Sequence, residues 1–235
     1  MLENWKDWAI SSQASEKRKV QRLKVKLNST YVLGDKMKFN KQSRNAILSI
    51  ILGDGYLDKN GGGKVLHCAA QLDYLNWKIK YLRSKGVACT DAIPKNNNGF
   101  DAYYTYLNVT KWSKLLRKVL YKSGGKNIYN RKLLNRLSAE HIAIWYMDDG
   151  GLSQKKREGV IYANELMINT HTTEDNNQII IDYFLEVWGI RFTQVLNRGH
   201  YRLRCGTKEA RKFLDIVREY VSQVPSMAHK LNIKS

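Results

Sequence analysis

Two largely apolar runs stand out in the chain, and each ends abruptly in an Asp-Gly dipeptide. The first covers Ile47–Leu52 and ends in Asp54-Gly55, and the second covers Ile142–Met147 and ends in Asp149-Gly150. Apolar residues occur on every side of a helix drawn through the first run, which predicts a buried helix. Two buried helices most simply pack against each other. We therefore expect Asp54 and Asp149 to lie close together, at a seam between two halves.

Around these runs the pattern of apolar residues and turn residues repeats in the order helix, two strands, helix, two strands, helix. The first half is predicted to hold a helix ending at Asp54, turns at residues 60–63 and 96–99, a helix over 73–85, a strand over 103–109 and a helix over 110–120. The second half is predicted to hold a helix from about Ser138, a strand pair with a polar loop over 152–171, a helix over 173–188, a turn at 197–199, a strand over 201–205 and a helix from Thr207.

Two pairs of landmarks support an internal repeat. Asp54 and Asp149 lie 95 residues apart, and Thr110-Lys111 and Thr207-Lys208 lie 97 residues apart. Nearly equal offsets from independent landmarks argue against chance. The sequence therefore predicts an α+β fold of two pseudo-symmetric halves, with an N-terminal arm over 1–38, a first half over 39–122, a linker over 123–137 and a second half over 138–235.

The charge of the chain favours a polyanionic partner. Lys and Arg outnumber Asp and Glu 40 to 21 in 235 residues, for a net charge of +19, and 14 tyrosines and 6 tryptophans are spread among the basic residues. This mixture suits a nucleic-acid surface better than a membrane surface, because no long basic amphipathic helix stands out. The basic run over 16–26 is either a solvated helix face or a phosphate-contacting extension.

Cysteine usage and hydropathy bear on the compartment. Cys68, Cys89 and Cys205 are odd in number and have no metal-ligand spacing, so a zinc site and a disulfide framework are both disfavoured. No apolar stretch approaches the ~18 residues of a membrane span, and the N-terminus lacks an apolar signal core. We expect an intracellular protein with reduced thiols, in a bacterial or phage-infected cytoplasm or in an organelle.

The two aspartates stand where a carboxylate is unfavourable. A helix C-terminus carries partial negative charge, which costs a carboxylate a few tenths to about 1 kcal/mol. One Asp-Gly dipeptide is usually a plain turn, but two copies after matched buried helices suggest that a cation lies between the carboxylates. Such a pair could hold Mg²⁺ against a phosphate, polarise the phosphoryl oxygen and activate a water.

The two runs resemble the paired signature helices of the LAGLIDADG homing endonucleases in their single-chain form. Residues 145–151 are similar to the second motif of the family branch encoded by the mitochondrial omega intron, and the resemblance covers nearly all of residues 40–232. It implies two αββαββα halves whose antiparallel sheets form a saddle over DNA. It also implies a monomer that cuts both strands of double-stranded DNA at a long, near-asymmetric site, with Mg²⁺ or Mn²⁺ as cofactor.

The same resemblance implies a set of site residues. Asp54 and Asp149 correspond to the catalytic, metal-binding acids, and Gly53 and Asp148 complete the implied metal site. Lys126 and Lys230 are placed like family lysines that help polarise the attacking water, although an arbitrary lysine among so many is usually solvated. All six residues are therefore candidates for the active site.

The chain departs from the family pattern at the helix seam. Ile144 and Asp148 replace small residues, and these larger side chains could pack over Ser49 and Gly53 of the first helix. Asp148 is either an acid that supports the metal site or a solvated neighbour of it. Of these two interpretations, we favour the solvated neighbour.

The predicted strands offer candidates for reading bases. Alternation along 201–205 places Arg202 and Arg204 on one face and Tyr201, Leu203 and Cys205 on the other, and arginines on an exposed ribbon can pair with guanine. Alternation in the first half places Tyr104, Tyr106 and Asn108 opposite Thr105, Leu107 and Val109. The remaining DNA-binding candidates are Lys64, Lys95, Asn96, Arg191 and Arg198, with Lys155, Lys156 and Arg157 in the loop after the second motif. His67, His171 and His200 could contact DNA or support the sheets.

Three functions are compatible with this pattern. The leading hypothesis is a site-specific, metal-dependent double-strand DNA endonuclease that mobilises its own intron or intein. An RNA maturase on the same fold, with intron RNA as its partner, would need the basic surface but not the carboxylates. A DNA-binding regulator on a retired nuclease scaffold would not need them either. The presence of both Asp54 and Asp149 favours the nuclease.

Overall fold

A computed structural model describes residues 39–97, 99–121, 126 and 130–232 of the chain. The predicted N-terminal arm and its basic run lie outside the described residues. The first half contains α2 (Lys41–Leu52), β1 (Tyr56–Leu57), β2 (Gly63–Cys68), α3 (Leu72–Ser84), β3 (Ile93–Asn97), β4 (Phe100–Leu107) and α4 (Lys111–Leu120). The second half contains α6 (Ala139–Asp149), β5 (Gly150–Arg157), β6 (Val160–Thr172), α7 (Glu174–Trp188), β7 (Thr193–Asn197), β8 (His200–Gly206) and α8 (Thr207–Val221). Both halves have the predicted order of helix, two strands, helix, two strands, helix.

Three short helices complete the described structure. Helix α5 (Arg131–Leu134) lies in the predicted linker, and the 3₁₀ helix η1 (Ala69–Gln71) precedes α3. The 3₁₀ helix η2 (Pro225–Leu231) follows α8 and lies against α3 of the first half. The second half therefore ends by contacting the first.

Each half forms one four-stranded antiparallel sheet, and the strand order is the same in both. The orders are β1-β2-β4-β3 and β5-β6-β8-β7, with Lys64 opposite Tyr106 in the first sheet and Met167 opposite Arg204 in the second. Irregularities at 155–156 and between Ile168 and Thr172 interrupt the second sheet. The repeated topology confirms the α+β fold of two related halves.

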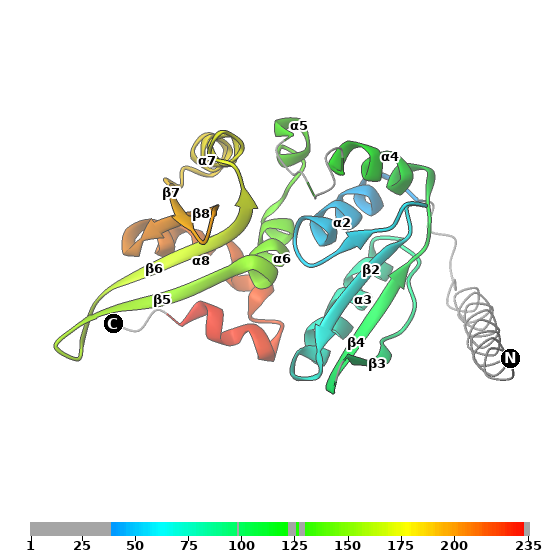
Figure 1. The fold of residues 1–235 in the computed structure, drawn as a ribbon, viewed down its shortest axis with the longest axis horizontal. Coiled ribbons are helices and arrows are strands. Elements are labelled where there is room, and N and C mark those ends of the chain that lie inside the picture. The colour runs from blue at the N-terminus through cyan, green and yellow to red at the C-terminus, as the bar shows by residue number, and fades with distance from the viewer. Residues whose placement is uncertain (1–38, 98, 122–125, 127–129, 233–235) are drawn as a thin grey trace, which may run out of the picture.

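Helices α2 and α6 lie side by side at the centre of the molecule, with one sheet on each flank (Figure 1). Their caps follow from the sequence: the Asn40 side chain accepts the backbone N–H groups of Gln42 and Ser43, and Ser138 and His141 form a reciprocal capping pair. Both helices are buried over most of their length, as the apolar runs predict. A helix pair buried at this position forms the core shared by the two halves.

The seam between the two helices is closed by packing at Gly53. A Cβ atom added there would lie 2.0 Å from Asp148 Oδ2, so only glycine fits opposite this side chain. The prediction that Asp148 packs over Gly53 is therefore confirmed. Because the helices contact each other near their C-terminal ends, the two Asp-Gly sequences lie at the same end of the pair.

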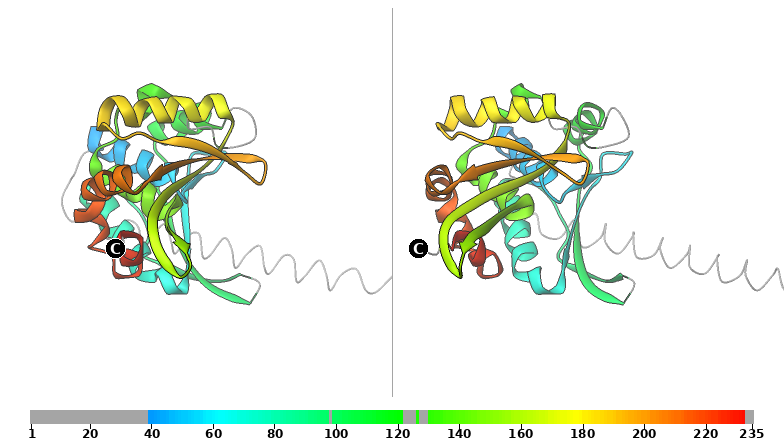
Figure 2. Two further views of the ribbon diagram at one scale, coloured as in Figure 1. Left: turned by 90° about the vertical axis from the view of Figure 1, so that its left-hand side faces the viewer. Right: turned by 60° about the vertical axis from the view of Figure 1, so that its left-hand side comes forward.

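Each sheet has helices on one of its faces. Helix α3 packs on β2 and β4, whereas α7 and α8 pack on the second sheet, whose strands curve away from the helix layer (Figure 2). Inward-facing strand residues such as Val65, Thr105 and Leu203 are fully buried. The alternate residues face outward, which leaves a polar and aromatic face on each sheet.

Two local predictions were wrong. Strand β4 ends at Leu107, and Val109 is 49% exposed rather than directed inward, because the chain leaves the sheet before the Thr110 cap of α4. Lys155, Lys156 and Arg157 lie in β5 and not in a loop, since the hairpin turns later, at Glu158-Gly159, both with positive φ. Within the described residues, no helix combines the length and apolar character needed to cross a membrane.

Candidate active site at the helix seam

The two predicted acids lie where the paired helices end. Asp54 follows Gly53, the C-cap of α2, and Asp149 is the last residue of α6. The Asp54 side chain is 41% exposed, and Asp149 is half-buried. Both acids thus remain accessible at the end of an otherwise buried helix pair.

The environment disfavours a negative charge on both acids. Burial, followed by the neighbouring Asp148 and Asp54 carboxylates, raises the pKa of Asp149 to about 7, against the opposing effect of Lys126. Burial and the Asp148 carboxylate likewise raise the pKa of Asp54. Carboxylates crowded in this way favour a bound cation or a proton.

Asp148 is not the solvated neighbour that the sequence favoured. Its side chain is fully buried, its Oδ1 accepts Lys78 Nζ at 2.5 Å and Tyr74 Oη at 2.7 Å, and its Oδ2 accepts the Asp54 N–H at 3.0 Å. Burial alone would raise the pKa of Asp148, but Lys78 and these hydrogen bonds lower it below its ordinary value. Asp148 is therefore an ionised, fully hydrogen-bonded carboxylate inside the seam.

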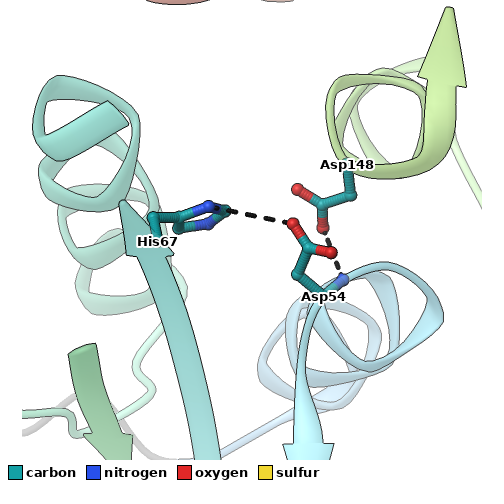
Figure 3. A group of neighbouring side chains, drawn as sticks. All are labelled: Asp54, His67 and Asp148. Atoms are coloured by element: carbon teal, nitrogen blue, oxygen red, sulfur yellow. Dashed lines mark hydrogen bonds and ion pairs between the residues drawn. The ribbon is translucent and has the colours of Figure 1, made fainter. Parts of the chain in front are cut away.

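His67 connects this buried cluster to Asp54. It points from β2 toward the two aspartates, with Nδ1 3.8 Å from Asp54 Oδ2 (Figure 3). Its Nε2 lies 3.0 Å from Lys78 Nζ, and burial together with the Lys78 charge lowers its pKa to about 4. His67 is therefore neutral at neutral pH and supports the site from within instead of facing outward.

Lys126 and Lys230 both lie at the C-terminal ends of the motif helices. Lys126 Nζ donates to the carbonyl oxygen of Gly53. Lys230 Nζ donates to the carbonyl oxygens of Met147 at 2.5 Å and Gly150 at 2.9 Å. Each lysine follows the motif helix that it contacts, Lys126 from the predicted linker and Lys230 from η2.

Oxygen donors in this site fit a divalent metal ion. Asp54, His67 and Asp148 have potential ligand atoms within 4.8 Å of one another, but the oxygens of Asp148 already accept three hydrogen bonds. The accessible carboxylates are those of Asp54 and Asp149, and hard oxygen ligands suit Mg²⁺ or Mn²⁺. A cation held by these two acids would also relieve the repulsion that raises the pKa of Asp149.

The outer face of the first sheet carries several of the predicted DNA-binding residues. Lys64 lies over the Tyr104 ring, 4.4 Å from its centroid, and the Tyr104 and Tyr106 rings pack edge to face. Tyr106 is 40% exposed, whereas Thr105 and Leu107 are buried on the opposite face. Lys95 and Asn96 extend this side of the protein along β3.

The second sheet shows the predicted alternation along β8. Leu203 and Cys205 are buried, whereas Arg204 is exposed and Arg202 half-buried. Glu165 on β6 pairs with Arg204 at 2.7 Å and with Lys155 at 3.5 Å. Lys156, Arg157, Arg191 and Arg198 are exposed, with Arg198 at the β7–β8 turn. His171 and His200 pack against each other beside this hairpin.

Sequence analysis did not identify two residues that surround the acids. Lys78 is fully buried, and Tyr74 donates to Asp148. The signal lay in helical spacing, because Lys78 stands four residues after Tyr74 and four before Leu82, both of which are buried. A lysine at such a position is usually assigned to solvent, since lysine is almost never fully buried unless paired.

Comparisons with known proteins agree with this fold. The model of the LAGLIDADG DNA endonuclease family matches residues 44–213. The homing endonuclease I-WcaI bound to its DNA recognition sequence aligns with a TM-score of 0.68 and 17% identity, over 88% of this chain and 99% of that one. RecA from Mycolicibacterium flavescens is 28% identical over 210 residues, or 83% of this chain and 47% of that protein.

RecA from Mycobacterium leprae is 27% identical over 207 residues, which is 28% of its length. The chain thus spans about half the length of the first of these relatives, and less of the second. The structural match establishes a shared fold, and the family model covers most of the chain. This protein belongs to the LAGLIDADG DNA endonuclease family.

Proposed function

We propose that this protein is a metal-dependent, site-specific endonuclease that cuts both strands of a DNA duplex. The observation that carries the proposal is the pair of accessible acids at the ends of packed helices, each with a lysine bonded to a carbonyl oxygen at the end of its helix. A pseudo-twofold pair of acids suits a duplex, whose strands have the same approximate symmetry. The net charge of +19 supplies attraction for phosphates.

Asp54 and Asp149 would hold Mg²⁺ or Mn²⁺, which when bound would polarise a phosphoryl oxygen and lower the pKa of a water. Lys126 and Lys230 would place positive charge beside the phosphate and the attacking water. Their ammonium groups are held by helix-end carbonyl oxygens, and burial lowers the pKa of both. The outer faces of the two sheets would bind the duplex on either side of the scissile bonds.

The match to part of longer RecA proteins fits a nuclease carried within a host gene product, as an intein would be. We also propose that the endonuclease acts as a monomer. Intron RNA would be the partner in the alternative function, that of an RNA maturase. An RNA maturase needs no accessible pair of acids, so the geometry favours the nuclease. The basic surface alone would serve either function.

Cleavage of a large pool of randomised duplexes, followed by sequencing of the ends, tests the proposal. We expect staggered cuts at one long site in Mg²⁺, and binding without cutting in Ca²⁺. A pool that is never cut in Mg²⁺ or Mn²⁺ would contradict the proposed function. Tight binding of a structured intron RNA by the same protein would then favour the maturase.

Replacing Arg202 with alanine tests the base-reading role of the second sheet. Arg202 is half-buried on β8 and alternates with the buried residues Leu203 and Cys205, which places it on the outer face of the sheet. We expect relaxed preference at one or two base pairs, at a cost of about 1–3 kcal/mol for the preferred base. The measurement is cleavage of all single-base variants of the selected site.

Lys156→Ala, on the exposed end of β5, is the matched comparison for Arg202→Ala. It removes a cation without a base-reading geometry, so affinity should fall evenly across sequences and become less sensitive to salt. An even loss for Arg202→Ala as well would assign Arg202 to phosphate contact.

A further inference from the structure

A network of buried hydrogen bonds reaches across the helix seam to Asp54. Asp148 of the second half accepts hydrogen bonds from Lys78 and Tyr74 of the first half through Oδ1. Through Oδ2 it accepts the backbone N–H of Asp54 at 3.0 Å. The end of α2 is thus attached to a carboxylate that two buried donors hold in place.

The same lysine also orients His67. Lys78 Nζ has only protons to offer, so His67 Nε2, 3.0 Å away, must accept. The ring proton is then on Nδ1, which lies 3.2 Å from Gln71 Oε1 and 3.8 Å from Asp54 Oδ2. Figure 3 shows the imidazole directed at the Asp54 carboxylate. Asp54 is therefore approached on its backbone by Asp148 and on its side chain by His67.

In the described part of the chain, the second half has no equivalent of this arrangement. The first-motif position that matches Asp148 is Gly53, which has no side chain to reach back across the seam. The space beside Gly53 is filled by Asp148 itself. Among the described residues, none donates a hydrogen bond to the Asp149 carboxylate. The difference between the two acids lies in the backbone bond from Asp54 to Asp148 and in the approach of His67 to the Asp54 carboxylate. Asp149 is instead the last residue of α6, beside carbonyl oxygens that accept from Lys230.

We propose that Lys78, His67 and Asp148 are positioning residues for Asp54, and that this one-sided support makes the two strands of the duplex break at unequal rates. The proposal rests on the proposed function, in which each acid serves one strand. An acid held in a reactive position before the substrate binds needs less reorganisation during the reaction.

The test variant combines Lys78→Met with Asp148→Asn, which removes both charges and keeps similar side-chain volumes. The substrate is the duplex selected from the randomised pool, labelled differently on each strand, so that each nicking rate is measured separately. We expect the ratio of the two nicking rates to change about tenfold from its value in the unmodified protein, because the strand served by Asp54 is cut more slowly. Duplex affinity in Ca²⁺ should stay within about threefold, because no outer-face residue changes.

Thr105→Val is the control for a purely structural effect. It removes a buried hydrogen bond, Thr105 Oγ1 to Thr90 O at 2.7 Å, within the same half. Any loss of folded protein lowers both nicking rates equally, so this variant should leave their ratio unchanged. If the double variant also slows both strands equally, the positioning role is wrong while the proposed function stands.

A second measurement needs no DNA. Hydrogen exchange of the Asp54 amide in the free protein should be about fivefold faster in the double variant. The reason is that the side chain at position 148, which accepts this amide, becomes neutral and no longer pairs with an ammonium group at position 78. Exchange at Leu52, the last residue of α2, serves as the internal reference. Unchanged exchange at Asp54 would overturn the positioning role. This result does not depend on cleavage, whereas a failure of the unmodified protein to cut any duplex would contradict the proposed function.

Discussion

Replacing either Asp54 or Asp149 with asparagine is expected to abolish double-strand cleavage while leaving duplex binding largely intact. Asparagine keeps the shape of the side chain but removes the charge that would hold a divalent cation between the two acids. Loss of that cation should remove about 4 kcal/mol of transition-state stabilisation, or roughly 10³-fold in rate. The measurement is cleavage of the selected duplex in Mg²⁺, with affinity measured separately in Ca²⁺.

The matched control for these substitutions is Asp215→Asn. Its side chain is 71% exposed on α8 and pairs with Arg218, one turn away. This control makes the same change in charge and should cut at the normal rate. If Asp54→Asn or Asp149→Asn still cut both strands at that rate, the active site would have to lie elsewhere.

The placement of these acids was predictable because it depends on local patterns that repeat. A helix that is apolar on all sides must be buried, and two such helices in matching positions of a repeat most simply bury each other. The same reasoning correctly placed Asp148 over Gly53, because a larger side chain needs a smaller one opposite. Turn residues gave the hairpins, and Ser138 gave the start of the second motif helix.

The buried network was not predictable, because it depends on contacts between distant parts of the chain. From its place next to Asp149, Asp148 is expected to be solvated. In the structure, α3 brings Lys78, some 70 residues earlier in the chain, against Asp148, and the lysine charge balances that of the carboxylate. His67 had two open interpretations for the same reason. Neither the presence of a partner nor its distance is encoded in the spacing of residues around Asp148.

The two errors on the sheets have a related origin. Alternation along 103–109 continues past Leu107, but the chain turns away to begin α4, so Val109 never faces the core. Charged residues at 155–157 resemble a loop, yet β5 continues through them because strand pairing with β6 satisfies their backbone groups. In both cases backbone pairing set the end of the strand, and side-chain pattern did not.

Replacing Lys78 alone with methionine is expected to destabilise the protein strongly. The Lys78 and Asp148 side chains are both fully buried, so this substitution leaves an ionised carboxylate without its cation inside the seam. Breaking such a pair on one side costs about 3–5 kcal/mol, whereas changing both partners costs much less. Urea denaturation at pH 7 should therefore find the Lys78→Met, Asp148→Asn double variant more stable than Lys78→Met.

An exposed ion pair provides the control for burial. Arg131 pairs with Glu186 at 2.6 Å on the surface, and Arg131→Met should cost no more than about 1 kcal/mol. Equal losses for Lys78→Met and Arg131→Met would show that burial of the Lys78 pair does not matter.

The pH dependence of Lys78→Met separates a charge effect from a packing effect. In the unmodified protein the pKa of Asp148 is lowered from 3.8, so its ionised form stabilises the fold above that value and the contribution is lost as the pH falls below it. Without Lys78, burial should raise this pKa, and the carboxyl can then take up a proton as the pH falls from 7 toward 5. The stability deficit of Lys78→Met should therefore shrink over that range. A deficit that stays constant would mean that Lys78 stabilises the seam by filling space and not by its charge.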